Sequence, residues 1–247
     1  MNKGQTRPHR EQPDLFSDNP EKPESHLLDD IDELFELSAE AHHVVSSAQM
    51  NEALVKADLE RYVQKILSAV RAEEFRAGSC PIRGGSGVEI QLAARSAAEK
   101  AAFDRGDPLV RTVLGAAYRV DREIHRLMGL LRFNPRPDGL WLARCAPDNF
   151  ILPAFAEHFT ARFGESSWAI IDEKRSLALV RLSGKDPCFG ALSSFPFLSG
   201  QELAQDDWEE LWRSYHRSIN IENRKNPLLQ LQLMPRRYWK YLPEIKL

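Results

Sequence analysis

Polar residues that could perform chemistry crowd into the stretch between Glu123 and Val180, among large aromatic side chains. The candidate cluster consists of His125, Arg126, Arg132, His158, Arg162, Asp172 and Arg175. Histidine transfers protons or binds metals near neutral pH, and arginine binds phosphate or carboxylate oxygens. A partly buried carboxylate needs a cation, so we expect Arg175 or Arg162 to pair with Asp172. Because each of these residues lies near an end of its element, we expect them to converge at one end of a small β-sheet.

This cluster does not specify a reaction. The chain has no HExxH or DxD motif and no paired carboxylates, which are the usual marks of metal sites and acid–base catalysts. A lone histidine beside arginine and phenylalanine is more often a hydrogen-bonded structural residue. Cys80, Cys145 and Cys188 are far apart, which argues against a zinc site and favours buried free thiols. We predict no metal and no cofactor, and the sequence leaves open whether the protein is an enzyme.

A second group of residues that could bind a ligand lies in the basic C-terminal region. Residues 1–110 hold 13 Lys+Arg and 20 Asp+Glu, whereas residues 211–247 hold 8 and 2, so these segments carry net charges of −7 and +6. Alternating cations and aromatic rings suit nucleic acid, since phosphates contact the charges and bases stack on the rings. The predicted nucleic-acid-binding residues are Arg213, Arg217, Arg224, Arg236, Arg237, Trp239 and Lys240. The alternative is that the acidic half neutralises this region and that Trp239 and Tyr241 pack on the core.

The apolar pattern predicts the elements that position these residues. Helices are expected over residues 27–37, 51–76, 89–103 and 107–132, and Asp107-Pro108 suits the start of the last one. A strand over 140–145, a helix over 150–163 and hairpin strands over 168–172 and 177–182 follow, whereas 183–205 is mostly loop. A last long helix begins at a capping pair, Asp206 and Glu209, and stops at Pro227. Its predicted buried stripe is Trp208, Leu211, Trp212, Tyr215 and Ile219.

These elements predict an α+β fold. The N-terminal half is helical, a strand–helix–hairpin unit forms a small antiparallel sheet with helices packed on one face, and the C-terminus is helical and basic. We expect a disordered tail over residues 1–25, a helical region over 26–106 and an α+β domain over 107–247. No apolar run reaches the roughly 18 residues of a membrane span, and no signal-peptide core begins the chain. We therefore expect no membrane contact and a cytoplasmic location.

Five segments of the chain together resemble a known bacterial family. They are HRLMGLLRF, HFTARF, WAIIDEKR, SINIENRKNP and MPRRYWKYLPE, in this order over roughly the last 130 residues. The family is described as probable DNA metabolism or putative DNA repair proteins and has no assigned biochemical activity. It typically accompanies a radical-SAM protein and also occurs fused to a uracil-DNA glycosylase-like protein. The resemblance thus implies DNA as the context and a radical-SAM partner, although this chain lacks the CxxxCxxC motif of the radical enzyme itself.

Three functions from different classes are compatible with these observations. The prediction is a DNA-binding accessory protein of a repair or base-modification system. The alternatives are a nucleic-acid-processing hydrolase or lyase with a His/Asp/Arg site, and a protein-interaction module that never contacts DNA. Salt-dependent DNA binding separates the first from the third, and metal content with nuclease or glycosylase assays tests the second.

Overall fold

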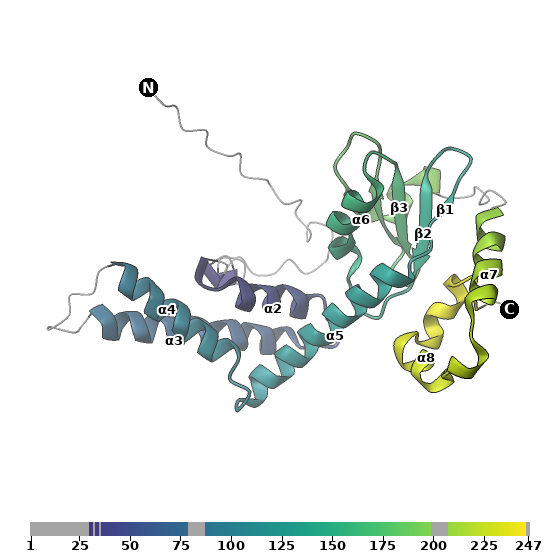
Figure 1. Cartoon of the computed structure of the whole chain (residues 1–247). Helices are drawn as coiled ribbons and strands as arrows, with labels where there is room; N and C mark the ends of the chain where they lie inside the picture. Colours follow the sequence, from purple (N-terminus) through teal and green to yellow (C-terminus); the bar gives the residue numbers. More distant parts are fainter. Residues whose placement is uncertain (1–29, 32, 35, 79–86, 199–206, 246–247) are drawn as a thin grey trace, which may run out of the picture.

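The computed structural model describes residues 30, 31, 33, 34, 36–78, 87–198 and 207–245 (Figure 1). The tail predicted for residues 1–25 lies outside the described residues. The fold is α+β, as predicted, with a helical part and a sheet-containing part that share one long helix. Among the described residues, no helix combines the length and the apolar character that crossing a membrane requires.

The N-terminal half is helical. Described residues between 30 and 37 are helical, and α2 (Ala39–Gln49), α3 (Lys56–Gly78) and α4 (Gly87–Ala102) follow. Their apolar faces meet in one core that buries Tyr62 completely. The sequence pattern does not separate α2, and the helix predicted from residue 51 begins at Lys56. The reason is Asn51, whose side chain accepts the Ala53 N–H and donates to the Ala116 carbonyl, which turns the chain between the two helices.

Helix α5 (Pro108–Leu130) joins the two parts of the molecule. Asp107 caps it as predicted, since its carboxylate accepts the Leu109 N–H at 2.7 Å. The first half of α5 buries Val113 in the helical core, and the second half buries Leu127 against the sheet. The domain boundary predicted between residues 106 and 107 therefore lies within one core, because residues before it and the first half of α5 pack against each other.

The sheet has five strands in the order β1-β2-β3-β4-β5. They are β1 (Asn134–Pro135), β2 (Trp141–Cys145), β3 (Trp168–Asp172), β4 (Leu177–Arg181) and β5 (Cys188–Ala191). The sheet is mixed rather than purely antiparallel, because β2 and β3 run parallel. Between them lie η1 (Leu152–Phe155) and α6 (Ala156–Phe163), a crossover that returns the chain to the starting edge. The sequence pattern predicts neither β1 nor β5, because both stretches are expected to be loop.

Each face of the sheet is covered differently. On one face, α5, η1 and α6 pack over Ala143, Cys145 and Ile170. On the other face, Leu142, Ala169 and Val180 pack against Leu198 and its neighbours in the segment after β5. Cys145 is buried as expected, Cys188 is exposed contrary to expectation at the edge strand, and Cys80 lies outside the described residues.

The C-terminal region departs most from the prediction. It forms α7 (Asp207–Ile219), η4 (Glu222–Arg224), α8 (Pro227–Leu233) and η5 (Arg236–Tyr241). Pro227 starts α8 instead of stopping a helix, because Asn226 caps it by accepting the Leu229 N–H at 3.0 Å. The predicted capping pair Asp206–Glu209 and the side chain of Trp208 lie outside the described residues.

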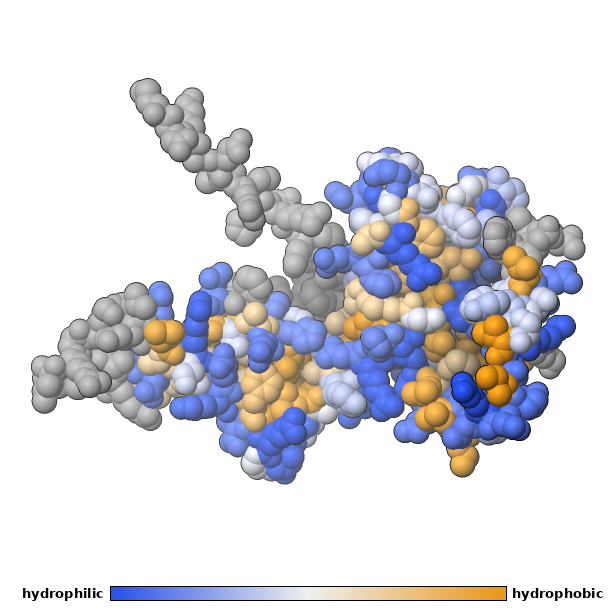
Figure 2. Space-filling view, in the orientation of Figure 1, coloured by the Kyte–Doolittle hydropathy of each residue, from blue (hydrophilic) through white to orange (hydrophobic). Residues whose placement is uncertain are grey.

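The predicted buried stripe of α7 is wrong for the residues that are described. Leu211, Trp212, Tyr215 and Ile219 are 58%, 39%, 52% and 54% exposed. Figure 2 shows hydrophobic residues at the surface around α7 and α8, interspersed with hydrophilic ones. An apolar helical stripe indicates which face is able to pack, and the tertiary structure decides whether another element covers it.

Candidate functional site

The predicted cluster of polar residues divides between opposite ends of the sheet. Asp172 ends β3, and Arg175 follows it in the turn to β4. Arg132 and Arg162 lie at the other end, where Trp141 begins β2. The expected convergence at one end is therefore wrong, because Arg132 and Arg162 stand at the C-terminal ends of helices that precede strands. Parallel strands start at that edge and carry Asp172 to the opposite one.

The pairing expected for Asp172 is confirmed. This fully buried carboxylate accepts a hydrogen bond from Arg175 Nη1 at 2.7 Å and from the N–H groups of Lys174 and Arg175. Arg175 also donates to Glu52 and to the carbonyl of Pro147. The two residues fix the β3–β4 turn against the loop after β2 and against the helical part.

Glu123 of α5 is a second buried carboxylate at this end of the sheet. It accepts hydrogen bonds from the N–H groups of Asp148 and Asn149 at 2.8 and 2.9 Å and from Tyr238 Oη at 2.6 Å. Burial alone would raise the pKa of the Glu123 carboxyl, but the hydrogen bonds from Tyr238 and from the two N–H groups lower it. Burial and the bond to Glu123 raise the pKa of the Tyr238 hydroxyl. Glu123 thus ties α5, the loop after β2 and η5 together.

Two of the predicted nucleic-acid-binding cations belong to the same end. Arg237 lies 2.8 Å from Asp148 Oδ2, and Lys240 Nζ lies 3.0 Å from Glu173 Oε2. Tyr241 Oη also donates to Glu173, at 2.7 Å. Ligands of open α/β sheets usually bind at the carboxyl ends of parallel strands. Here the C-terminal segment lies at that end of the sheet, and its cations are paired with Asp148 and Glu173. This end of the sheet is therefore better suited to a structural role than to catalysis.

The opposite end of the sheet contains a cavity of about 470 Å³, which we call the aromatic–arginine pocket. Its lining residues are Gly129, Leu131, Arg132, Phe133, Trp141, Arg162, Phe163 and Trp212. Three of the rings pack on one another, with centroid distances of 4.7 Å between Phe133 and Phe163 and 6.1 Å between Trp141 and Phe163. Trp212 reaches the same cavity from α7.

The two arginines of the pocket differ in their partners. Arg132 Nη2 donates to Glu244 Oε1 at 2.6 Å, and its guanidinium lies 5.6 Å from the centre of the Trp212 ring. Trp212 Nε1 donates to the other oxygen of Glu244 at 3.1 Å. Burial would raise the pKa of Glu244, but the bond from Arg132 lowers it. Arg162 is exposed and makes no hydrogen bond or ion pair within the described part of the chain.

The remaining members of the predicted cluster lie on helix surfaces. His125 of α5 and His158 of α6 are exposed, and the ring centroid of His158 lies 4.8 Å from that of Phe159. Arg126 is half-buried. In the described residues, no group of three or more His, Cys, Asp or Glu side chains is arranged to hold a metal ion. Within the described chain, neither histidine makes a hydrogen bond or ion pair to another member of the predicted cluster.

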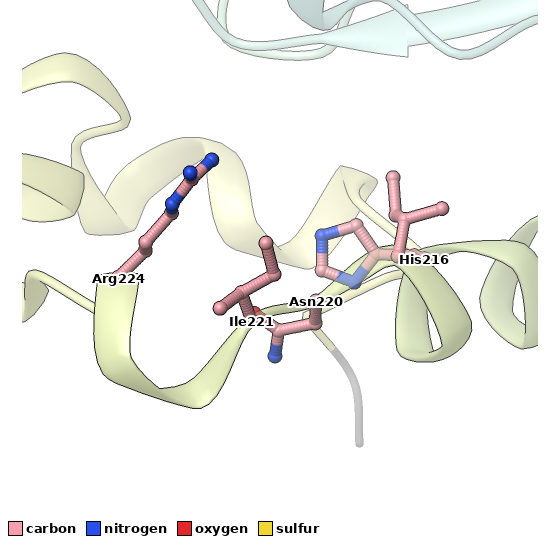
Figure 3. Close-up of a pocket in the computed structure, with 5 residues that line it drawn as sticks. His216, Asn220, Ile221 and Arg224 are labelled. Carbon is pink, nitrogen blue, oxygen red and sulfur yellow. The ribbon is translucent and has the colours of Figure 1, made fainter.

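The other predicted nucleic-acid contacts lie on α7, η4 and η5. Arg217 and Arg224 are exposed, Arg213 Nε donates to the Pro243 carbonyl at 3.3 Å, and Arg236 lies 5.8 Å from the ring centre of Trp239. Arg224 also lines a shallow cavity of about 280 Å³ with His216, and Asn220 and Ile221 lie between them (Figure 3). The continuity of these cations as one basic surface stays a prediction.

A family model covers most of this architecture. The model of a domain of unknown function, DUF4130, matches residues 89–244, which is more than half of the chain. The chain belongs to this family. The matched DUF4130 segment contains α5, the whole sheet and every residue that lines the aromatic–arginine pocket. No curated protein and no solved structure matches the chain.

Sequence reasoning missed three important residues of the DUF4130 segment. Glu123 stands at the edge of the stretch that supplied the candidate cluster, and Glu244 ends the motif MPRRYWKYLPE. Glu244 stands between Pro243 and Ile245, and Glu123 falls on the apolar face of α5 with Val120 and Leu127, so both positions could have indicated buried carboxylates. Trp212 belongs to a stripe that suggested a core, and no local signal distinguishes a pocket wall from a buried ring.

Proposed function

We propose that this protein binds nucleic acid as an accessory protein of a DNA repair or base-modification system. The observation that supports the proposal is the aromatic–arginine pocket, where Arg162 and the rings of Trp141, Phe163 and Trp212 share one cavity. Aromatic faces stack on bases, and guanidinium groups bind phosphate oxygens. The exposed cations Arg217 and Arg224 add positive charge elsewhere in the C-terminal region.

The paired charges at the other end of the sheet make a hydrolase or lyase a weaker candidate. Asp172, Glu123 and Glu173 each accept several hydrogen bonds from the protein's own groups. The oxygens of these carboxylates are occupied by donors of the protein itself, which does not suit a general acid or base. A binding role therefore uses the described geometry better than a catalytic role does.

The test is a salt titration of DNA affinity by fluorescence anisotropy, with a labelled single strand and a duplex of about 16 nucleotides. Log K should fall linearly with log salt between about 50 and 200 mM, with a slope of about −0.7 per neutralised phosphate for the single strand. Arg162→Gln should flatten that slope by about 0.7. Arg95→Gln is the matched control, since Arg95 is an exposed arginine of α4 that lies outside the aromatic–arginine pocket. Absence of binding at low salt would favour the interaction-module alternative.

The family resemblance adds a radical-SAM enzyme as the proposed partner. A pull-down with tagged protein from cells that express both chains tests this part separately. Co-purification supports it, and recovery of the tagged protein alone contradicts it without affecting the DNA-binding proposal.

A further inference from the structure

We infer that the aromatic–arginine pocket takes one unstacked nucleotide, with its base against Trp212 and its phosphate on Arg162. This inference rests on the proposed function and narrows its ligand to an unpaired nucleotide within a single strand. Three features of the pocket support it, namely the size of the cavity, the exposure and packing of its rings, and the different partners of its two arginines.

The cavity has the dimensions and lining of a small-ligand site. Its volume of about 470 Å³ lies within the range of about 300–1,000 Å³ that is common for such sites. Trp141, Phe133 and Phe163 come from the sheet and the ends of α5 and α6, whereas Trp212 comes from α7. A flat ligand that enters between them contacts aromatic surface from two separate elements.

Trp212 is the ring best placed to stack on an incoming base. Its aromatic neighbour among the described residues is Tyr215 of the same helix, at a centroid distance of 5.7 Å, and the Arg132 guanidinium lies 5.6 Å from its ring centre. Trp212 is nevertheless 39% exposed. Phe133 and Phe163, in contrast, already pack edge-on against each other. Glu244 holds the Trp212 indole through Nε1, so the ring is oriented before a ligand arrives.

The two arginines supply different parts of nucleotide recognition. Glu244 neutralises Arg132, whose Nε is nevertheless buried without a hydrogen-bond partner among the described atoms. A buried donor of this kind is costly unless a ligand or water completes it, so Arg132 is suited to an acceptor on a base edge. Arg162 is exposed and has no ion-pair partner in the described chain, so it is suited to the phosphate.

This arrangement requires an unpaired base. In a duplex the faces of each base are covered by its neighbours, so a pocket that works by stacking receives only a base outside the stack. The cations of α7 and η4 would bind phosphates of duplex and single strand alike. A preference for single strands over duplex should therefore depend on the pocket.

The experiment compares Trp212→Ala, Trp212→Phe and wild type for anisotropy binding to a single strand, to the same strand with one abasic site, and to a duplex. Trp212→Ala should lose roughly fivefold to hundredfold affinity for the single strand, which corresponds to one stacked base, and should leave duplex affinity unchanged. Trp212→Phe should retain most of the affinity. Tyr118→Ala removes a ring that is 63% exposed on α5 and is the matched control. Thermal melts by circular dichroism establish that each variant is folded.

Three outcomes separate this inference from the proposed function. Loss of single-strand affinity in Trp212→Ala alone, with weaker binding of the abasic strand, supports both. DNA binding that is equal in wild type and Trp212→Ala overturns the pocket inference and leaves the proposed function standing. If no DNA binds, titration with dAMP and dTMP decides: saturable quenching of tryptophan fluorescence that Arg162→Gln weakens supports a free nucleotide as ligand, and no quenching overturns the inference.

Discussion

At the scale of single residues, buried charges decide how the DUF4130 domain is held together. Asp172 is completely buried, and Arg175 is its only side-chain partner in the described structure. Removal of one member of a buried ion pair leaves an uncompensated charge, which costs much more than the pair itself contributes. Such a pair acts through its geometry, because it fixes one turn of the chain against another.

Arg175→Ala should lower the free energy of unfolding by about 3–5 kcal/mol, because Asp172 remains buried without its cation. Arg144→Ala is the control, since Arg144 is exposed and lies 3.6 Å from Glu173, and its loss should cost less than about 1 kcal/mol. Urea denaturation followed by fluorescence measures both values. Equal effects of the two substitutions would show that the Asp172 pair is not a buried ion pair in solution.

Glu123 predicts a specific pH dependence of stability. Its pKa is lower in the folded chain than the value of about 4.3 in the unfolded chain, so its contribution is complete above that pH. The contribution is lost as the pH falls through the folded-state pKa. At pH 7, Glu123→Gln should cost about 1–3 kcal/mol, and the difference from wild type should shrink below about pH 4. Glu165→Gln, at an exposed position, should show no such trend, and a constant difference for Glu123→Gln would contradict the assignment.

At the scale of elements, the backbone conformation of one glycine determines how the chain leaves α6. Gly164 ends α6 with φ 55° and ψ −121°, a region that is accessible almost only to glycine. Its carbonyl also accepts a hydrogen bond from Arg181 of β4. The turn by which the chain leaves α6, directly after the pocket residues Arg162 and Phe163, is therefore set by this residue.

Gly164→Ala should destabilise the protein by about 1–3 kcal/mol through backbone strain, although its Cβ would meet no atom within 4 Å. Gly115→Ala is the matched control within α5, where an added Cβ would only approach a flexible Arg119 atom at 3.6 Å. Because alanine suits a helix interior better, that variant should gain about 0.5–1 kcal/mol. Chemical denaturation of both variants is the measurement, and destabilisation by Gly115→Ala with none by Gly164→Ala would reverse this interpretation.

At the scale of the whole molecule, α5 couples two cores. Its first half packs in the helical core and its second half under the sheet, so neither core is complete without the helix. All five tryptophans lie at or after Trp141, in the part that contains the sheet and the C-terminal helices. Fluorescence therefore reports on that part, whereas far-ultraviolet circular dichroism also reports on α2, α3 and α4.

We expect the fluorescence and circular-dichroism unfolding curves to coincide, because α5 transmits unfolding between the cores. Val113→Ala, which creates a cavity in the helical core, should lower both midpoints together although no tryptophan lies there. A shift of the circular-dichroism curve alone would show that the helical part unfolds independently. Val55→Ala, at a position 61% exposed, is the control that should change neither curve.

The sequence by itself determined the features that depend on short-range physics. The Asp107-Pro108 start of α5, the strands over 168–172 and 177–181, and the α+β class follow from caps and apolar periodicity. The need of Asp172 for an arginine partner also follows, because a buried carboxylate needs a cation, and the structure selects Arg175 over Arg162. These signals act between residues a few positions apart, where local backbone geometry restricts the possible conformations.

Only the tertiary structure decided which distant residues meet. The crossover through α6 makes β2 and β3 parallel, and this direction places Arg162 and Asp172 at opposite ends of the sheet. Glu123 meets Tyr238 across 115 positions, and Arg132 meets Glu244 across 112. The stripe of α7 satisfies every local rule for a buried face, yet much of it stays exposed and Trp212 becomes a pocket wall. The physical reason is that local periodicity sets which face of an element is able to pack, whereas the packing of the whole chain sets what that face contacts.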